Sequence, residues 1–175
     1  MTTDWTLVQR ARDGDEAAWR ELVCRHRPRL MKLTLLIAGD PAAAEDAVQE
    51  TFVRLLAYGQ AQTKGSFATL AGTIAYRFAL KERSRINKHA ALDGFDQASD
   101  MASPLQTVLN REQDRLLVEA LFALDEAHRD ILILRFYGGH EYNEIAELTG
   151  LPLGTVKSRI FYAVKQCREK MKLET

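Results

Sequence analysis

Apolar residues recur at intervals of three and four along almost the whole chain, and no window alternates apolar and polar residues for long enough to predict a strand. The pattern therefore predicts an all-α fold. The first four predicted helices cover residues 4–12, 16–37, 41–58 and 66–87. Asp4, Asp15 and Asp40 stand where they can cap the first three helices, while Pro28 predicts a kink or a break inside the second.

The helical periodicity fades after this first group. Residues 89–104 contain a Gly, several Asp and Ser residues and a final Pro, a composition that is typical of a flexible linker. Helical spacing returns near Leu105 and continues to Tyr137. The predicted organisation is two small helical domains joined by a flexible linker, with the first domain at residues 1–88, the linker at 89–104 and the second domain at 105–175.

A tight corner between two helices is predicted within residues 140–172. Gly150 can leave the first helix with a positive φ, Pro152 cannot continue that helix, and Thr155 can cap the second. The small Ala146 lies inside the corner, and the second helix is basic. This is the geometry of a helix-turn-helix, whose second helix lies in the DNA major groove. The alternative is an ordinary helical hairpin with a solvated basic face.

The second helix of this corner separates an apolar stripe from a basic face. The stripe consists of Val156, Ile160, Ala163, Val164 and Cys167. On the other faces, Arg159 can form a two-point bond to guanine, and Lys157 can reach a phosphate or a base. The candidate DNA-contacting residues of this helix are Thr155, Lys157, Ser158, Arg159 and Lys165.

The formal net charge of zero conceals two basic segments. Residues 62–89 carry six Lys and Arg residues against one Glu, and residues 156–172 have the same balance, so each segment has a net charge of +5. Two basic surfaces on a neutral chain indicate two separate contacts with a polyanion. In the first segment, Arg77, Lys81 and Arg85 repeat every four residues and can follow the phosphates of one strand.

The sequence gives little support for a disordered chain, a disulfide-rich protein, a membrane protein or a metalloenzyme. Hydrophobic residues make up 46% of the chain, which excludes wholesale disorder. Cys24 and Cys167 are predicted on apolar helix faces, without the spacing of a disulfide framework or a metal site. No signal peptide is visible, and the longest apolar run, 33–38, is too short for membrane insertion. Asp125 and His128 form only half of a metal-binding pair, so we expect no metal, no cofactor and no enzymatic activity.

Three stretches stand in a definite order along the chain. Residues 40–52 read DPAAAEDAVQETF, residues 124–136 read LDEAHRDILILRF, and residues 154–159 read GTVKSR after the pattern Tyr142-x-x-Ile145-Ala146. Their order and spacing resemble the signatures of the extracytoplasmic-function (ECF) family, the smallest class of bacterial sigma factor. The resemblance covers nearly the whole chain.

This resemblance implies a cytoplasmic alternative sigma factor that binds core RNA polymerase and directs it to promoter DNA. In the family, the helix that matches residues 41–58 docks on the clamp helices of the largest polymerase subunit. The corresponding polar residues here are Glu45, Asp46, Gln49 and Glu50. The resemblance also implies that the helix-turn-helix reads the minus-thirty-five element and that an anti-sigma factor can hold the chain.

The basic helix at 66–87 matches the part of the family that reads and melts the minus-ten element. The residues implied for this DNA contact are Lys64, Arg77, Lys81 and Arg85. The sequence departs from the family pattern in this helix: Leu70 stands where Trp is common, Arg77 where Asn is usual, and Lys81 where an acidic residue is often found.

Two other classes of protein are open alternatives. A free-standing LuxR-type transcriptional regulator also carries the Gly154-Thr155-Val156-Lys157 pattern, but such regulators usually continue with a His near Arg159 and lack the stretch at residues 44–52. An all-helical metalloenzyme is the third class, and it has only the Asp125 and His128 pair in its favour.

Overall fold

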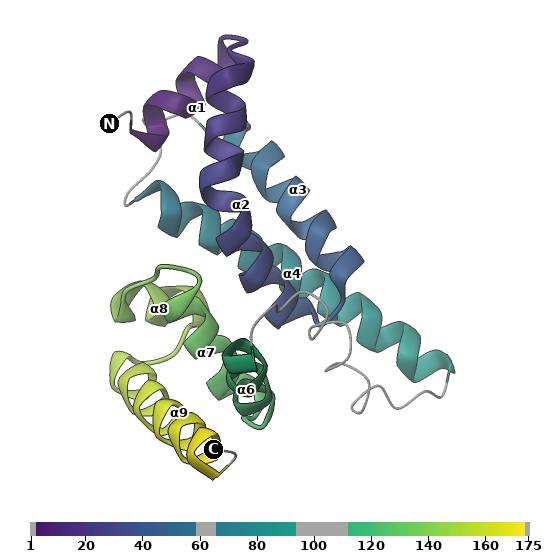
Figure 1. The fold of residues 1–175 in the computed structure, drawn as a ribbon, viewed down its shortest axis with the longest axis vertical. Helices are drawn as coiled ribbons and strands as arrows, with labels where there is room; N and C mark the ends of the chain where they lie inside the picture. The colour runs from purple at the N-terminus through teal and green to yellow at the C-terminus, as the bar shows by residue number, and fades with distance from the viewer. Residues whose placement is uncertain (1–2, 59–65, 94–111, 174–175) are drawn as a thin grey trace.

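The computed structural model describes residues 3–58, 66–93 and 112–173, and all regular structure in these ranges is helical (Figure 1). The all-α prediction is therefore confirmed. The described helices are α1 (Asp4–Arg12), α2 (Glu16–Ala38), α3 (Pro41–Ala57), α4 (Phe67–Asp93), α6 (Glu112–Phe122), α7 (Glu126–Phe136), α8 (Tyr142–Thr149) and α9 (Leu153–Leu173).

Helices α1 to α4 form an N-terminal bundle. In Figure 1, α2 and α3 run side by side across α4, and α1 packs against the beginning of α2. The three long helices pack closely against one another. Leu30 of α2, Leu55 of α3 and Ala75 of α4 are fully buried where these helices meet. The exposed surfaces of α3 and α4 are thereby left for polar side chains.

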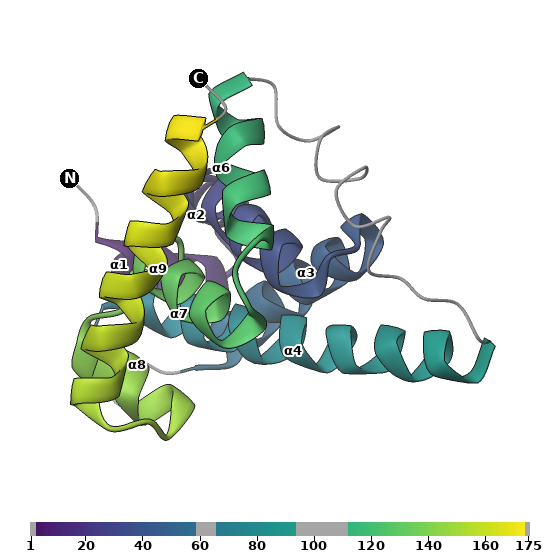
Figure 2. The same cartoon turned by 90° about the horizontal axis from the view of Figure 1, so that it is seen from below.

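Helices α6 to α9 form a C-terminal bundle on one side of α2 and α4. In Figure 2, the long helix α9 lies across α7 and alongside α6, while α8 lies near its beginning. The fully buried Ile133, Leu134 and Ile145 belong to its core. The two predicted helical domains are confirmed, while Leu105 and the rest of residues 94–111 lie outside the described residues.

The turns between the helices follow the predicted capping chemistry. Oδ1 of Asp15 accepts bonds from the backbone N–H groups of Ala17 and Ala18, and Oδ1 of Asp40 accepts one from Ala43 at 2.7 Å. These two caps are confirmed. The first helix differs, because the Thr3 hydroxyl accepts the bond from the backbone N–H of Thr6, and Asp4 is already helical.

Three details of the sequence interpretation are corrected. Of the kink or break predicted at Pro28, the break is wrong, because helix α2 continues through the proline, with buried residues on both sides that pack against α3 and α4. Helix α4 extends to Asp93, so residues 89–93 are helical where a linker was predicted. Cys24 is exposed, whereas Cys167 is buried as predicted.

Candidate nucleic-acid interface

The predicted helix-turn-helix is formed by α8 and α9. Gly150 ends α8 in the left-handed conformation with φ of 71°, as predicted from its position. The fully buried Ile145 and Val156 hold the two helices against the rest of the bundle. Helix α9 begins at Leu153, so Thr155 lies in the first turn and is not the cap, a correction to the predicted start.

The solvent-facing side of α9 carries most of the residues that were predicted to contact DNA. Lys157, Ser158 and Lys165 are exposed, whereas Thr155 and Arg159 are half-buried. The Ser158 hydroxyl donates a bond to the Thr155 carbonyl at 3.0 Å, and Lys165 lies 4.0 Å from a Glu169 carboxylate oxygen. The structure therefore brings these five side chains together on one helix, beside the turn that follows α8.

Two aromatic side chains on the same helix were missed by the sequence analysis. Phe161 and Tyr162 are 65% and 56% exposed, and their rings meet edge to face with centroids 5.5 Å apart. A helical-wheel comparison would have found them, since both fall off the buried stripe that runs through Ile160 and Ala163. Large exposed aromatic groups on a basic helix are suited to contact base edges or methyl groups.

A second basic face lies on α4. Arg77, Lys81 and Arg85 are exposed at four-residue spacing, as predicted, and Arg85 also forms an ion pair with Glu82 at 2.7 Å. Lys64, the fourth residue predicted for this contact, lies outside the described residues. Arg83 belongs to the same helix but turns away from this face, and its guanidinium contacts α7 instead.

The polar residues of α3 lie opposite its buried stripe. Asp46 and Gln49 are exposed, whereas Glu45 and Glu50 are half-buried and form ion pairs with Arg27 and Arg54, respectively. The four side chains predicted to contact a protein partner therefore share one surface, and two of them are partly neutralised by neighbouring cations.

The acidic surface of α3 adjoins the basic surface of α4. A shallow groove of about 330 Å³ runs between the two helices and is lined by residues of both, among them Asp46, Glu50 and Lys81. The Arg54 guanidinium lies 5.8 Å from the centre of the Phe78 ring and closes part of this groove. A protein partner on α3 and a nucleic acid on α4 would therefore sit next to each other.

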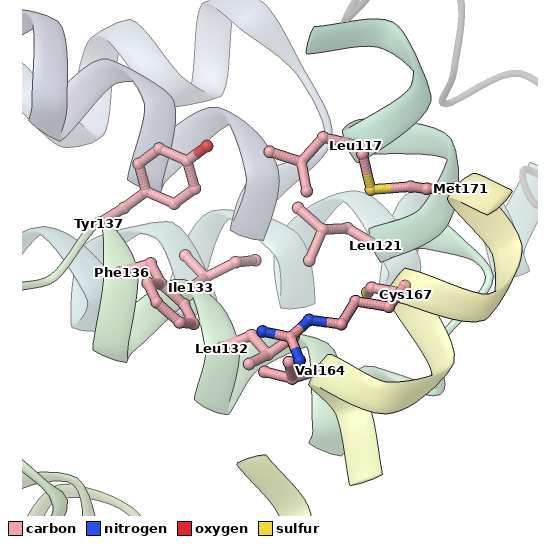
Figure 3. A pocket seen from close by; sticks show the side chains of 10 residues that line it. Leu117, Leu121, Leu132, Ile133, Phe136, Tyr137, Val164, Cys167 and Met171 are labelled. Atoms are coloured by element: carbon pink, nitrogen blue, oxygen red, sulfur yellow. The ribbon is translucent and has the colours of Figure 1, made fainter. Parts of the chain in front are cut away.

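An apolar groove of about 430 Å³ lies between α6, α7 and α9 (Figure 3). Leu117, Leu121 and Met171 line one part of it, and Phe136, which is 65% exposed, stands at its edge. Cys167 also lines the groove, and burial raises the pKa of its thiol, so it remains a neutral thiol. Apart from Arg168, the lining residues are mostly apolar, so the groove differs in character from the basic side of α9.

The Asp125 and His128 pair has a structural role. Oδ1 of Asp125 accepts the backbone N–H of His128 at 3.1 Å and caps α7, while Oδ2 lies 2.6 Å from Nδ1 of the same histidine. Within the described ranges, no three His, Cys, Asp or Glu side chains converge where a metal ion could bind. None of the helices in that part of the chain has the length and apolar character that a bilayer crossing requires.

The fold and these surfaces define a two-domain helical protein with a helix-turn-helix. Residues 22–89 match the family model of sigma-70 region 2, and residues 120–169 match that of sigma-70 region 4. The ECF RNA polymerase sigma factor SigL of Mycobacterium tuberculosis is 32% identical over 166 residues, which cover 92% of this chain and 93% of SigL. The ECF RNA polymerase sigma factor RpoE of Cereibacter sphaeroides is 30% identical and covers 97% of this chain and 96% of its own.

The chain belongs to the ECF family of RNA polymerase sigma factors, and the predicted family and class of function, an alternative sigma factor, are confirmed. The fold is similar to that of CnrH in its complex with the cytosolic domain of CnrY, with a TM-score of 0.63, 21% identity and coverage of 98% of this chain and 99% of CnrH. RpoE in complex with the anti-sigma factor NepR from Bartonella quintana gives a TM-score of 0.62 at 22% identity, covering 90% of this chain and 98% of that one. Similarity along both bundles favours this family over a LuxR-type regulator.

Proposed function

We propose that this chain binds bacterial core RNA polymerase and brings two DNA-binding surfaces to a promoter, one on each bundle. The observation that carries the proposal is the pairing of two basic faces, on α4 and α9, with an acidic face on α3 in a chain of the sigma factor family. Relatives that share nearly its whole length are RNA polymerase sigma factors.

Helix α9 is assigned to the minus-thirty-five element. Arg159 is the residue best suited to read a guanine edge, because its guanidinium forms a planar fork. Lys157 and Lys165 are assigned to phosphates, and Thr155 and Ser158 to phosphate or base contacts. Phe161 and Tyr162 are added here as apolar contacts to base methyl groups, since their exposed rings lie on the same helix.

Helix α4 is assigned to the minus-ten element. Arg77, Lys81 and Arg85 form the cationic row along which a single strand can run, with Lys64 in the preceding segment as a fourth contact. Melting requires that a base leave the duplex stack, which costs a few kcal/mol and is favoured by phosphate contacts that hold the separated strand.

The acidic surface of α3 is assigned to core RNA polymerase. Asp46 and Gln49 are exposed and free to enter an interface, and Glu45 and Glu50 frame them. A basic partner surface complements this charge, in accordance with the steering role of complementary fields. We assign residues 1–93 to polymerase docking and the minus-ten element, residues 94–104 to a linker, and residues 105–175 to the minus-thirty-five element.

We further propose that the chain acts in the cytoplasm without catalysis of its own and is held by an anti-sigma factor. Two solved structures of similar fold contain a protein bound to CnrH or to RpoE, and the second is named an anti-sigma factor. An inhibitor of this chain would cover the α3 surface or the basic face of α4, because both are required for initiation.

Reconstitution tests the proposal. The purified chain is mixed with sigma-free core RNA polymerase, co-elution is measured, and transcripts initiated on fragmented genomic DNA are sequenced. Co-elution together with discrete start sites preceded by two recurrent sequence elements is the expected result. Absence of binding to core polymerase that a second sigma factor activates would contradict the proposal.

A further inference from the structure

The beginning of α4 is enclosed by two aromatic side chains from other helices. Phe67, the first residue of α4, is only 3% exposed. The Trp5 ring of α1 meets the Phe67 ring edge to face, with centroids 5.3 Å apart and an interplanar angle of 82°. The centroid of the His26 ring of α2 lies 4.8 Å from that of Phe67, at an interplanar angle of 55°. The first side chain of α4 is thus held by α1 and α2 together.

Helix α1 is fastened to α2 at the residue before Trp5. Nη1 of Arg25 donates to Oδ1 of Asp4 at 2.6 Å, and Oδ2 of the same carboxylate lies 3.1 Å from Nε2 of His26. Asp4 is half-buried and His26 is buried, so these charges interact in a partly desolvated place where their attraction is stronger than in bulk water. The contacts of Asp4 therefore hold the neighbouring Trp5 ring against Phe67.

The first turn of α4 also has a local cap. The Ser66 hydroxyl accepts a bond from the backbone N–H of Thr69 at 3.0 Å, and the Ser66 carbonyl accepts one from Leu70 at 3.1 Å. This cap determines where the helix begins, because it involves only neighbours within a few positions. It does not determine how the helix lies against α1 and α2, which depends on the packing of side chains.

Phe67 is the large residue on a buried stripe of α4 that otherwise consists of alanines. The three alanines are fully buried, and the residues at four-residue spacing are Phe67, Ala71, Ala75 and Ala79. Alanine lets α4 approach the neighbouring helices closely, but it resists a slide or a rotation of the helix less than a large side chain does. The enclosed Phe67 ring resists both movements.

A displacement at the beginning of α4 would be carried along the helix. The helix is continuous from Phe67 to Asp93, so Arg77 lies about 15 Å after Phe67 on the same rod. A slide by the rise of one residue, about 1.5 Å, would move every exposed cation of α4 by the same amount. Charge-assisted bonds to phosphate form at about 2.7–2.9 Å, so such a slide would weaken them.

Helix α1 lies outside the part of the chain that matches a family model. The match to sigma-70 region 2 begins at residue 22, whereas α1 ends at Arg12. In Figure 1, α1 lies beside the beginning of α2 and above the first turn of α4. None of the residues assigned to polymerase or DNA belongs to α1. Its contact with Phe67 is therefore its direct connection to the surface assigned to the minus-ten element.

We propose that Trp5, acting through Phe67, is a positioning residue for the minus-ten contact. By holding the beginning of α4, it sets where the cationic row of Arg77, Lys81 and Arg85 stands on a separated strand. The proposal rests on the proposed sigma function, and it adds α1 to the parts of the chain on which promoter melting depends. Trp5 itself contacts neither DNA nor polymerase in this role.

Two Trp–Phe pairs of the same bundle allow a matched comparison. Trp19 of α2 meets Phe52 of α3 edge to face, with centroids 5.5 Å apart and an interplanar angle of 83°. Trp5→Ala and Trp19→Ala therefore remove similar contacts at different places in the bundle. Trp5→Phe keeps an aromatic ring beside Phe67 and serves as the conservative variant. Asp4→Asn weakens the attachment of α1 to α2 without opening a cavity.

Hydrogen–deuterium exchange of the free, full-length chain gives the first readout. The backbone amides of Thr69 and Leu70 report on the first turn of α4, because both donate to Ser66. Their exchange should be about threefold to tenfold faster in Trp5→Ala, the factor that corresponds to the usual worth of an edge-to-face pair. Exchange in Trp5→Phe and Trp19→Ala should remain close to that of the parent.

Binding of fork DNA to the reconstituted polymerase complex gives the second readout. The labelled probe is duplex upstream and has an unpaired minus-ten strand, with the sequence of a promoter found by reconstitution, and fluorescence anisotropy measures its affinity. Trp5→Ala should weaken fork binding by about threefold to tenfold, while its affinity for core polymerase stays that of the parent. Trp5→Phe should restore fork binding, and Trp19→Ala should retain it.

Parent-like exchange and fork affinity in Trp5→Ala would overturn the proposal. Equal losses of fork affinity in Trp5→Ala and Trp19→Ala would also overturn it, because they would assign the effect to bundle stability. If Trp5→Ala does not fold, Asp4→Asn decides: a smaller loss of fork affinity at unchanged core affinity is expected, and no loss would overturn the proposal. A parent chain that does not bind active core polymerase would instead contradict the proposed sigma function, so the two failures are distinguishable.

Discussion

Phe161 and Tyr162 form an edge-to-face aromatic pair on the exposed side of α9, with ring centroids 5.5 Å apart and an interplanar angle of 78°. Lys157 precedes Phe161 by one turn, and Lys165 follows it by one turn, so the ring lies between two cations on one side of the helix. A phosphate on each lysine would bring the ring toward the base edges of the major groove.

Phe161 is expected to contact thymine methyl groups. Phe161→Ala should weaken binding of the polymerase complex to its minus-thirty-five element by about threefold to tenfold. Replacement of thymine by deoxyuracil in that element should weaken the parent complex by a similar factor and leave the variant unaffected, because both changes remove the same contact. Filter binding or fluorescence anisotropy measures the affinities of the parent and the variant complexes for the two DNAs, which together form a double-mutant cycle.

Phe136→Ala is the matched control for this cycle, since Phe136 is equally exposed at 65% but lies at the apolar groove away from α9's basic face. It should retain the full response to deoxyuracil. An equal response to deoxyuracil in the Phe161 variant and the parent would remove Phe161 from the base-contacting set.

Arg159 and Lys165 are expected to differ in the kind of contact they make. Loss of a base-reading Arg costs about 1–3 kcal/mol and relaxes specificity at one base pair, whereas loss of a phosphate-contacting Lys weakens all sites and reduces the salt dependence. Arg159→Ala should therefore change the preferred promoter sequence, and Lys165→Ala should not. Binding of a randomised minus-thirty-five library at two salt concentrations distinguishes them, and uniform losses in both variants would contradict the assignment of Arg159.

Asp46 of α3 is expected to contribute to polymerase binding. Asp46→Lys places a cation at the centre of the acidic surface and should weaken binding to core polymerase by about tenfold or more, mainly through slower association. Glu16→Lys changes the charge equally on α2, where its partner Arg20 is 75% exposed, and should have little effect. Surface plasmon resonance with immobilised core polymerase gives both rates, and equal rates in the two variants would exclude this surface.

The buried histidines predict a loss of stability in acid. Burial lowers the pKa of His140 below its ordinary 6.5, with Arg29 acting in the same direction and Glu144 and the Leu134 carbonyl opposing. Burial similarly lowers the pKa of His26, opposed by Asp4. The unfolded chain therefore takes up protons near pH 6.5, before the folded chain does, so stability is complete above this pH and falls below it.

The melting temperature should accordingly fall by about 3 °C or more between pH 7.5 and pH 5.5. His140→Gln should reduce this dependence, whereas the exposed His89→Gln should leave it as in the parent. Calorimetric scans at a series of pH values measure the slope. A His140 variant with the slope of the parent would show that this residue does not carry the effect.

The ends of several helices could be predicted from the sequence, because a single capping or glycine residue determines the local backbone there. Asp15 and Asp40 cap their helices as predicted, and Gly150 ends α8, because each feature depends on neighbours within a few positions. Pro28 shows the limit of such reasoning, since packing on both sides of the residue maintains a helix that local propensity would interrupt.

Contacts between distant segments could not be predicted in the same way. Helical spacing places Arg83 among the cations of α4 but does not indicate that its side chain turns toward Asp130, which is 47 residues away. Likewise, Phe161 and Tyr162 are residue types that are common in protein cores. Only their position relative to the buried stripe of α9 indicates that they face solvent. Which helix face contacts which distant segment depends on how the helices pack in the folded bundles.

Arg29, Thr73 and Arg83 of the N-terminal bundle bond to Tyr137, His140 and Asp130 of the C-terminal bundle, respectively. The surfaces of the two bundles are thus complementary to each other. A gene divided after Asp93 would yield two polypeptides with complementary faces, and fusing each to one member of a binding pair would make transcription report whether those two proteins meet in a cell.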